Sequence, residues 1–355
     1  MPTLLNQQSS VSLRLRDAAA AFTLTAPQNL VQQWRGHRVW IGWIACLLIL
    51  AGGLGYVEES GWSRAENTAS MYVGSPTTDN HGVAYYPVRS AYQGYREQMI
   101  RVLRPTHPLP GVEPSTVYVL PVAPGVNTLS SKWSDGLEQL RLLDVPNRFN
   151  MTLIAPSFQY IPWYADHPRD PCRRMESFLI RDLVPFGDTL GPSGHIRHRY
   201  IIGFSKSGYG AFTLILRHPD LFQAAAAWDF PAELDNISAF PDLSGNFADQ
   251  ENFSGYEIPA LITANAAEFQ HENRLWISGD QGIFTHDMTK LHRQLTALSI
   301  PHTWVQGGYR RHDWSSGWLE GAVEYLAANS TNETPAGALF AERNANHQRQ
   351  RAGHE

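Results

Sequence analysis

The chain has 355 residues, of which 43% are hydrophobic, and it carries a formal net charge of −5. This length and apolar content exclude fibrous and wholly disordered classes, and they suffice for one large core of roughly 250 residues. The negative charge and the lack of a Lys/Arg-rich run in the sequence argue against nucleic acid as a partner. Cys46 and Cys172 lie in unlike segments, so we expect a fold without a disulfide.

The N-terminal part predicts a membrane anchor. Residues 1–38 are polar and are expected to form a cytoplasmic tail, whereas residues 39–57 are nineteen residues without a charge. A helix of that length, about 28 Å, just crosses a hydrocarbon core. Arginines precede it and Glu58 and Glu59 follow it, which places the N-terminus in the cytoplasm and the rest of the chain on the far side. A cleaved signal peptide is the alternative, and both interpretations export the remainder.

Composition divides the rest of the chain into three parts. We expect a linker at 58–75, one globular domain at 76–328 and a polar, disordered tail at 329–355. Inside the domain, two early segments predict an antiparallel strand pair at 82–88 and 96–105.

After this pair, short apolar runs alternate with segments of helical spacing. One such helix is indicated by Leu291, Leu295 and Leu298, which recur at intervals of four and three residues. Alternating strands and helices predict a mostly parallel sheet covered on both faces, with ligands at the carboxyl ends of its strands. The predicted strands are 115–122, 151–158, 199–205, 223–230, 274–279 and 301–308.

The segment RYIIGFSKSGYGAF, residues 199–212, predicts a strand, a sharp bend and a helix. A nucleophile elbow needs small residues two places before and after its serine, because strand and helix approach closely there. Ser205 has Gly203 and Ser207 at those places, whereas Ser207 has the large Tyr209 at one of them. Ser205 is therefore the candidate nucleophile. The alternative is an ordinary turn in which Ser205 caps the helix.

Lys206 follows the candidate serine and has an unusual position. A cation in the first turn opposes the helix dipole at a cost of roughly 0.3 to 1 kcal/mol. Two interpretations stay open: a solvated side chain, or attraction for an anionic substrate group or the developing oxyanion. Independently of its side chain, the backbone N–H of Lys206 is expected to donate to the oxyanion, as the residue after the nucleophile normally does.

His312 is the candidate base, because it lies in the loop between the last predicted strand and a terminal helix. Two aspartates are candidates for the acid that would orient His312. Asp280 is preferred and Asp229 ranks almost equally, because each follows a predicted strand. Asp287 ranks third, since it would only favour the start of a helix. A surface histidine or a metal pair of His312 with Asp313 are the alternatives, but no HExxH motif or paired cysteine spacing supports zinc.

Residues 76–327 resemble the putative esterase family that includes esterase D and the mycolyltransferases. The resemblance is carried by the elbow segment RYIIGFSKSGYGAFTLILRHPDLFQAAAA, by ESFLIRDLVPF from Glu176 and by RRHDWSSGW at the end. It implies an α/β-hydrolase fold, with a mostly parallel central sheet and helices on both faces, here preceded by one transmembrane helix. It also implies a serine triad that contains Ser205 and His312.

The sequence departs from the family pattern at the elbow and at the oxyanion loop. Lys206 and Ser207 stand where the family has methionine and glycine. The family's His-Gly oxyanion loop is replaced by LPVAPG, residues 120–125, so we expect the second N–H donor at Val122 or Ala123.

Two further positions bear on the acid and on the substrate. The family's acid stands three residues after a glycine like Gly279, but Gly282 occupies that place, which keeps both Asp280 and Asp229 open. Residues 161–168 resemble the segment that lines the family's substrate cleft. Trp163 and Tyr164 are therefore candidates for its wall, with an ordinary core role as the alternative.

These features together predict an exported, membrane-tethered serine hydrolase that cleaves carboxylic esters through an acyl-Ser205 intermediate. The substrate would be a small-molecule, lipid or carbohydrate ester, and neither a metal nor a cofactor is required. Acyl transfer to a sugar or lipid is a variant of the same chemistry. The alternative from another class is a surface binding module on a hydrolase scaffold that has lost turnover.

Overall fold

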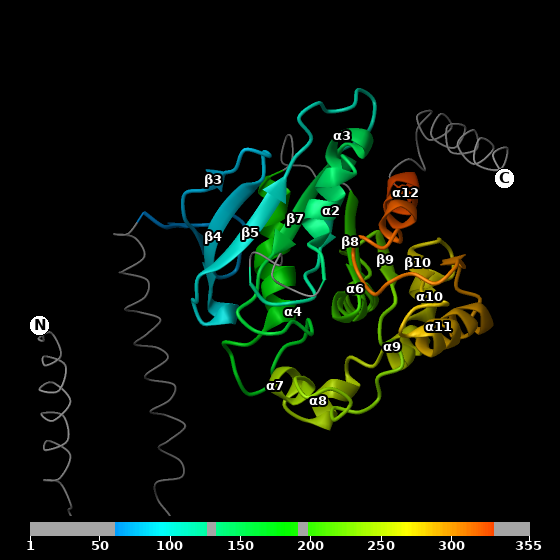
Figure 1. Ribbon diagram of the computed structural model, residues 1–355. Helices are drawn as coiled ribbons and strands as arrows, with labels where there is room; N and C mark the ends of the chain where they lie inside the picture. Colours follow the sequence, from blue (N-terminus) through cyan, green and yellow to red (C-terminus); the bar gives the residue numbers. More distant parts are fainter. Residues whose placement is uncertain (1–60, 126–132, 191–197, 330–355) are drawn as a thin grey trace, which may run out of the picture. The chain divides into compact units, whose positions relative to one another are not determined.

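The computed structural model describes residues 61–125, 133–190 and 198–329 (Figure 1). The predicted tail 1–38, the predicted anchor 39–57 and residues 330–355 of the predicted C-terminal tail lie outside these residues. Within the described ranges, no helix has both the length and the apolar character that a membrane span requires.

The described residues form one large sheet with helices between its strands. The strands are β1 (Ser63–Arg64), β2 (Met71–Val73), β3 (Thr77–Thr78), β4 (Ala84–Ser90), β5 (Gln98–Leu103), β6 (Ser115–Val119), β7 (Met151–Pro156), β8 (His198–Phe204), β9 (Ala224–Trp228), β10 (Leu275–Ser278) and β11 (Thr303–Val305).

Among the helices of the described ranges most are short, and the longest two are α6 and α11. The helical segments are η2 (Ala91–Gln93), α2 (Gly136–Leu142), α3 (Val145–Phe149), α4 (Met175–Phe178), η4 (Leu179–Leu183), α5 (Val184–Thr189), α6 (Lys206–Arg217), α7 (Leu243–Phe247), α8 (Gln250–Ser254), α9 (Ile258–Ala264), α10 (Ala266–Phe269), α11 (Thr285–Ala297) and α12 (Leu319–Asn329).

The strand order is β1-β2-β4-β5-β7-β6-β8-β9-β10-β11, with β3 paired to β4. Strands β4 and β5 are antiparallel, and β5 is antiparallel to β7. From β7 to β11 every pair is parallel. The predicted antiparallel pair and the six later strands are therefore present, with β4 and β5 toward one end of the sheet and β10 toward the other (Figure 1).

The stretch expected to be a linker, 58–75, contributes two strands to this sheet. β1 pairs with β2, and β2 pairs with β4, where Met71 lies opposite Ser90. Met71 is fully buried. The linker prediction is therefore corrected for this part of the chain, because strands of two and three residues leave too short a pattern to recognise.

Alternate residues of the central strands fill two cores, one on each face of the sheet. On β6, Val117 and Val119 pack with residues of α2, α3 and α12, whereas Tyr118 packs on the opposite face with residues of α5 and α6. All five residues of β6 are buried, as expected of a central strand in a parallel sheet. The loops that follow β6, β8 and β9 leave the sheet at the same edge. They are anchored by strands that pack against a core on each face.

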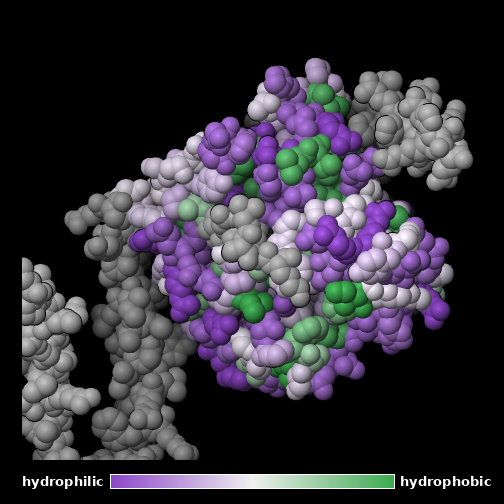
Figure 2. Space-filling model, in the orientation of Figure 1, coloured by the Kyte–Doolittle hydropathy of each residue, from purple (hydrophilic) through white to green (hydrophobic). Residues whose placement is uncertain are grey.

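The surface offers little apolar area on the side seen in Figure 2, where hydrophobic residues form separate small patches within a mostly hydrophilic face. Exposed large apolar side chains include Ile161, Ile283 and Tyr309. Single exposed apolar residues of this kind are normal and need no binding partner.

A buried ionic cluster fixes the far end of α6 to α4. The Glu176 carboxylate accepts from Arg217 Nε at 2.7 Å and from the Tyr256 hydroxyl at 2.5 Å, and it lies 2.7 Å from His218 Nε2. Burial alone would raise the pKa of Glu176, but the hydrogen bonds from His218 and Arg217 lower it to about 2.

We predict that this cluster makes the fold acid-sensitive. The pKa of Glu176 is lower in the folded chain than its ordinary value of 4.5. The stabilisation of the fold by the ionised Glu176 is therefore complete above about pH 4.5, and it is lost as the pH falls toward 2. That contribution is on the order of 3 kcal/mol. Glu176→Gln should lower the free energy of unfolding at pH 7 and flatten its fall below pH 4.5, measured by urea titration at several pH values.

Glu138→Gln is the matched control, because Glu138 pairs with Arg141 at 2.7 Å in a partly exposed position on α2. Its free energy of unfolding should change by less than about 1 kcal/mol. An acid profile of Glu176→Gln that parallels the wild type would contradict the role of the cluster.

Candidate active site

The bend between β8 and α6 holds Ser205 in a strained conformation. Ser205 has φ 54° and ψ −133°, a region that residues other than glycine rarely adopt, at a cost on the order of 1–3 kcal/mol. Its side chain makes no capping hydrogen bond to α6. The alternative of an ordinary N-cap is therefore not supported, and the hydroxyl has no partner among the described residues.

Gly203 and Ser207, two places before and after Ser205, explain the shape of the bend. A Cβ atom on Gly203 would lie 2.2 Å from the carbonyl oxygen of Ser207, so only glycine fits at that place. The Ser207 Oγ accepts from the Phe204 N–H at 3.0 Å and donates to the Phe204 carbonyl at 2.8 Å. The hydroxyl of Ser207 thus closes the turn, whereas that of Ser205 is available for chemistry.

The structure pairs His312 with Asp229. The His312 Nδ1 atom lies 2.6 Å from Asp229 Oδ2, and the Phe284 N–H donates to Asp229 Oδ1 at 2.8 Å. Asp229 is fully buried. The order of serine, acid and histidine along the chain agrees with that of an α/β-hydrolase.

This geometry favours Asp229 over Asp280, the first choice of acid. Asp280 does not contact His312; its Oδ1 accepts from the Gly307 N–H at 3.2 Å. Asp287 accepts from the Glu233 N–H at 3.0 Å. Both carboxylates follow β10, and they are bound to loops instead of the imidazole.

Gly282 shows why the acid stands after β9. A Cβ atom on Gly282 would lie 2.2 Å from Asp229 Oδ1 and 2.6 Å from Oδ2. The carboxylate of Asp229 therefore fills the space beside the position where the resemblance places an acid. The backbone of Asp229 supports this arrangement, since its N–H donates to the Ser278 carbonyl at 3.1 Å.

Aromatic rings surround the imidazole of His312. The ring centroids of Phe204, Phe284 and Trp133 lie 5.0, 5.8 and 6.4 Å from its own. Because Phe204 directly precedes Ser205, these contacts hold the imidazole on the side of the bend. The other ring nitrogen, Nε2, makes no hydrogen bond to a described residue.

The metal alternative for His312 and Asp313 gains no support. Asp313 accepts instead from the N–H groups of Ser134 at 3.1 Å and Ser315 at 2.8 Å. In the ranges that the structure describes, no three His, Cys, Asp or Glu side chains form a group that could hold a metal ion.

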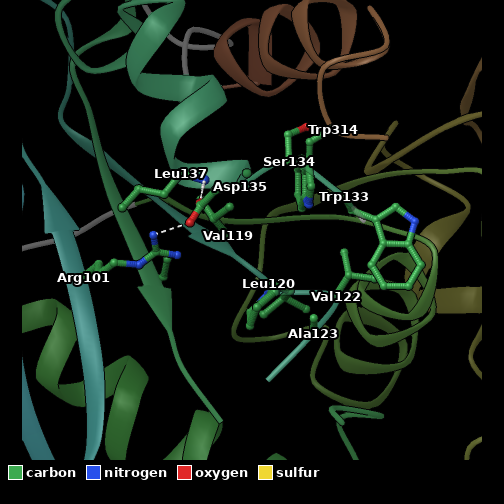
Figure 3. Close-up of a pocket in the computed structure, with 13 residues that line it drawn as sticks. Arg101, Val119, Leu120, Val122, Ala123, Trp133, Ser134, Asp135, Leu137 and Trp314 are labelled. Carbon is green, nitrogen blue, oxygen red and sulfur yellow. Dashed lines mark hydrogen bonds and ion pairs between the residues drawn. The ribbon is translucent and has the colours of Figure 1, made fainter. Parts of the chain in front are cut away.

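The candidate oxyanion donors lie at the ends of neighbouring strands. Lys206 begins α6, so its N–H has no partner within the helix, and Val122 and Ala123 follow β6. None of these three N–H groups donates to a described residue. Figure 3 shows Val122 and Ala123 along a pocket that Trp133 also lines.

Sequence reasoning missed two residues of this pocket. Arg101 of β5 and Asp135 form a buried ion pair among the residues that line it (Figure 3). Asp135 also caps α2, accepting from the Leu137 N–H at 2.9 Å. An aspartate before a helix is a sequence signal for an N-cap, so the capping role of Asp135 could have been predicted. No sequence pattern indicates that Arg101 on β5 is its ion-pair partner.

The two aromatic residues expected to wall the substrate cleft are fully buried. The Tyr164 hydroxyl donates to the Pro121 carbonyl, its ring fills the space beside Gly210, and burial raises its pKa well above the usual value. Trp163 Nε1 donates to Asp242 Oδ2 at 2.6 Å. Tyr164 is therefore a core residue, whereas Trp163 is a buried residue whose ring contacts Lys206.

The ammonium of Lys206 lies against two indole rings. Its Nζ atom is 5.7 Å from the ring centroid of Trp133 and 5.8 Å from that of Trp163. Both distances are within the range of cation–π attraction, which is worth about 0.5–1 kcal/mol at exposed sites. The interpretation of a freely solvated side chain is therefore replaced by one that is packed beside the bend.

Residues 157–313 match the family model described as putative esterase. The matched segment contains Ser205, Asp229 and His312, and it confirms the resemblance seen in the sequence. No curated protein sequence matches the chain.

Solved structures define the fold class. S-formylglutathione hydrolase from Agrobacterium tumefaciens is 16% identical with a TM-score of 0.53, covering 73% of this chain and 98% of its own. FphF, a fluorophosphonate-binding serine hydrolase of Staphylococcus aureus in a substrate-bound state, is 16% identical with a TM-score of 0.54, covering 73% and 100%. The chain therefore has an α/β-hydrolase-like fold, and its family match supports ester hydrolysis in general.

We predict that Gly282→Ala disrupts the pair of Asp229 and His312. The added methyl group overlaps the carboxylate, so the free energy of unfolding should fall by about 1–3 kcal/mol. The low-field proton signal of the His312 Nδ1–H, measured by NMR, should shift or vanish. Gly308→Ala is the matched control, since a Cβ atom there meets nothing within 4 Å. An unchanged signal in Gly282→Ala would contradict the packing described here.

Proposed function

We propose that this chain is a serine esterase that cleaves carboxylic esters through an acyl-Ser205 intermediate. The observation that carries the proposal is the 2.6 Å contact between His312 Nδ1 and the buried carboxylate of Asp229. The imidazole packs against the ring of Phe204 at 5.0 Å, and Phe204 directly precedes Ser205, whose φ is 54°. A carboxylate on Nδ1 fixes the tautomer whose Nε2 can accept a proton. The imidazole is then able to act as a base toward the hydroxyl of Ser205.

The first half of the reaction forms the acyl-enzyme. His312 Nε2 takes the proton of Ser205 Oγ while the oxygen attacks the ester carbonyl carbon. The negative charge that develops on the carbonyl oxygen is stabilised by the N–H groups of Lys206 and of Val122 or Ala123. Each donor is worth on the order of 3 kcal/mol. The tetrahedral intermediate then releases the alcohol, which receives the proton from His312.

The second half repeats these roles with water as the nucleophile. His312 accepts a proton from water, whose oxygen attacks the acyl carbonyl, and it returns that proton to Ser205 as the acid leaves. Asp229 remains ionised and stabilises the imidazolium in both halves. Neither a metal nor a cofactor takes part in this scheme.

The proposed location is outside the cytoplasm, with residues 39–57 as a membrane anchor. This part of the proposal is supported by the uncharged length of the segment and by the arginines before it. It concerns residues outside those that the structure describes, and the proposed chemistry does not depend on it.

We predict that a fluorophosphonate probe labels the wild-type protein stoichiometrically and does not label Ser205→Ala, as intact-protein mass spectrometry can measure. Ser207→Ala is the control, and it should still be labelled because its hydroxyl only bonds the backbone of Phe204. Loss of labelling in Ser207→Ala alone, or no labelling of the folded wild type, would contradict the proposal. The latter result would favour a binding module without turnover.

A second prediction separates the two candidate acids. Asp229→Asn should lower kcat on a p-nitrophenyl ester by roughly 10⁴-fold, because the amide no longer holds the required tautomer. Asp280→Asn should change kcat by less than about tenfold, because its carboxylate contacts only the Gly307 N–H. Equal losses in the two variants, or a larger loss in Asp280→Asn, would show that the assignment of Asp229 is wrong.

A further inference from the structure

The charge of Lys206 is uncompensated in the described part of the chain. Of the two lysines there, Lys290 pairs with Glu233 at 2.8 Å, whereas Lys206 has no described carboxylate within ion-pair distance. Its Nζ atom lies within cation–π range of the indole rings of Trp133 and Trp163. The face of a neutral ring attracts a cation but does not neutralise it, so the ammonium of Lys206 remains able to bind an anion.

The carboxylates around the site are already engaged. Asp229 binds His312 and the Phe284 N–H, and Asp242 accepts from Trp163 Nε1 at 2.6 Å. Neither is paired with Lys206. The residue next to the proposed nucleophile thus presents a positive charge that no described acid neutralises.

The position of Lys206 makes this charge costly for local stability. It occupies the first residue of α6, a helix of twelve residues, where the partial positive charge of the helix end repels a cation. Residues that break a local rule in this way occur mainly at functional sites, where another interaction offsets their cost. Packing against two indoles also limits the freedom of this side chain, which directly follows Ser205 in the chain.

We infer that Lys206 selects esters that carry a negatively charged group close to the scissile bond. This inference rests on the proposed esterase function and adds the substrate class to it. The shared chemistry is an anionic oxygen group, such as a carboxylate or a sulfonate, placed on the acyl part or on the alcohol. The ion pair would form in a partly dehydrated setting, where a charge-assisted hydrogen bond is stronger than in water.

Two matched substrate pairs test the inference and locate the anion. The acyl arm compares the p-nitrophenyl monoester of adipic acid with its methyl-capped, neutral diester. The alcohol arm compares 4-acetoxybenzenesulfonate with 4-acetoxyphenyl methyl sulfone. In each arm the measured quantity is the ratio of kcat/KM for the anionic ester to kcat/KM for the neutral one, so differences in leaving-group reactivity cancel between protein variants.

Lys206→Met should lower this ratio at least tenfold in one of the two arms, mainly through a higher KM for the anionic ester. Lys206→Arg should keep most of the ratio, because it retains the charge. Lys290→Met, which removes the same charge elsewhere, should leave the ratio unchanged. The wild-type ratio should also fall as salt is raised from 0.05 to about 0.5 M. A ratio in Lys206→Met equal to that of the wild type in both arms would overturn the inference.

A binding measurement separates this inference from the proposed function. Calorimetry would titrate adipate and 4-hydroxybenzenesulfonate into Ser205→Ala and into Ser205→Ala/Lys206→Met. At least one anion should bind the first protein at least tenfold more tightly than the second. Equal or undetectable binding to both proteins would overturn the selection of anions. Absence of hydrolysis and of probe labelling in the wild type would instead overturn the esterase function, and calorimetry would still decide the role of Lys206.

Discussion

The hydrogen bond between His312 and Asp229 is the interaction on which the site depends. It joins a loop after β11 to the end of β9, and it is made by a carboxylate that is fully buried. A buried carboxylate requires partners, and the imidazole and the Phe284 N–H supply them. The pair therefore holds the two loops together and fixes the imidazole, whose ring packs against Phe204 at the end of β8.

The glycines and the serines around the site follow from this arrangement. Gly282 leaves room for the carboxylate, and Gly203 leaves room for the backbone at Ser207. Ser207 takes the place of a glycine in the family pattern, and its hydroxyl closes the turn through the backbone of Phe204. The departures from the pattern thus change how the site is supported, and the contact between His312 and Asp229 is present beside them.

Much of the fold and part of the site could be predicted from the sequence. The six later strands were visible as apolar runs, and the bend identified Ser205 because residue size alone excluded Ser207. The choice between Asp229 and Asp280 could not be made, since both follow a strand and only three-dimensional contacts distinguish them: Asp229 bonds His312, and Asp280 bonds the Gly307 N–H. The contacts of Lys206 with Trp133 and Trp163 were also beyond prediction, because rings 73 and 43 residues away in the sequence give no local signal.

The most direct test of the account is a crystal structure of the chain after reaction with a fluorophosphonate. The account predicts phosphorus bound to Ser205 Oγ, a phosphoryl oxygen facing the N–H groups of Lys206 and of Val122 or Ala123, and His312 Nδ1 still bonded to Asp229. An adduct on a different residue, or an imidazole bonded to Asp280, would contradict it.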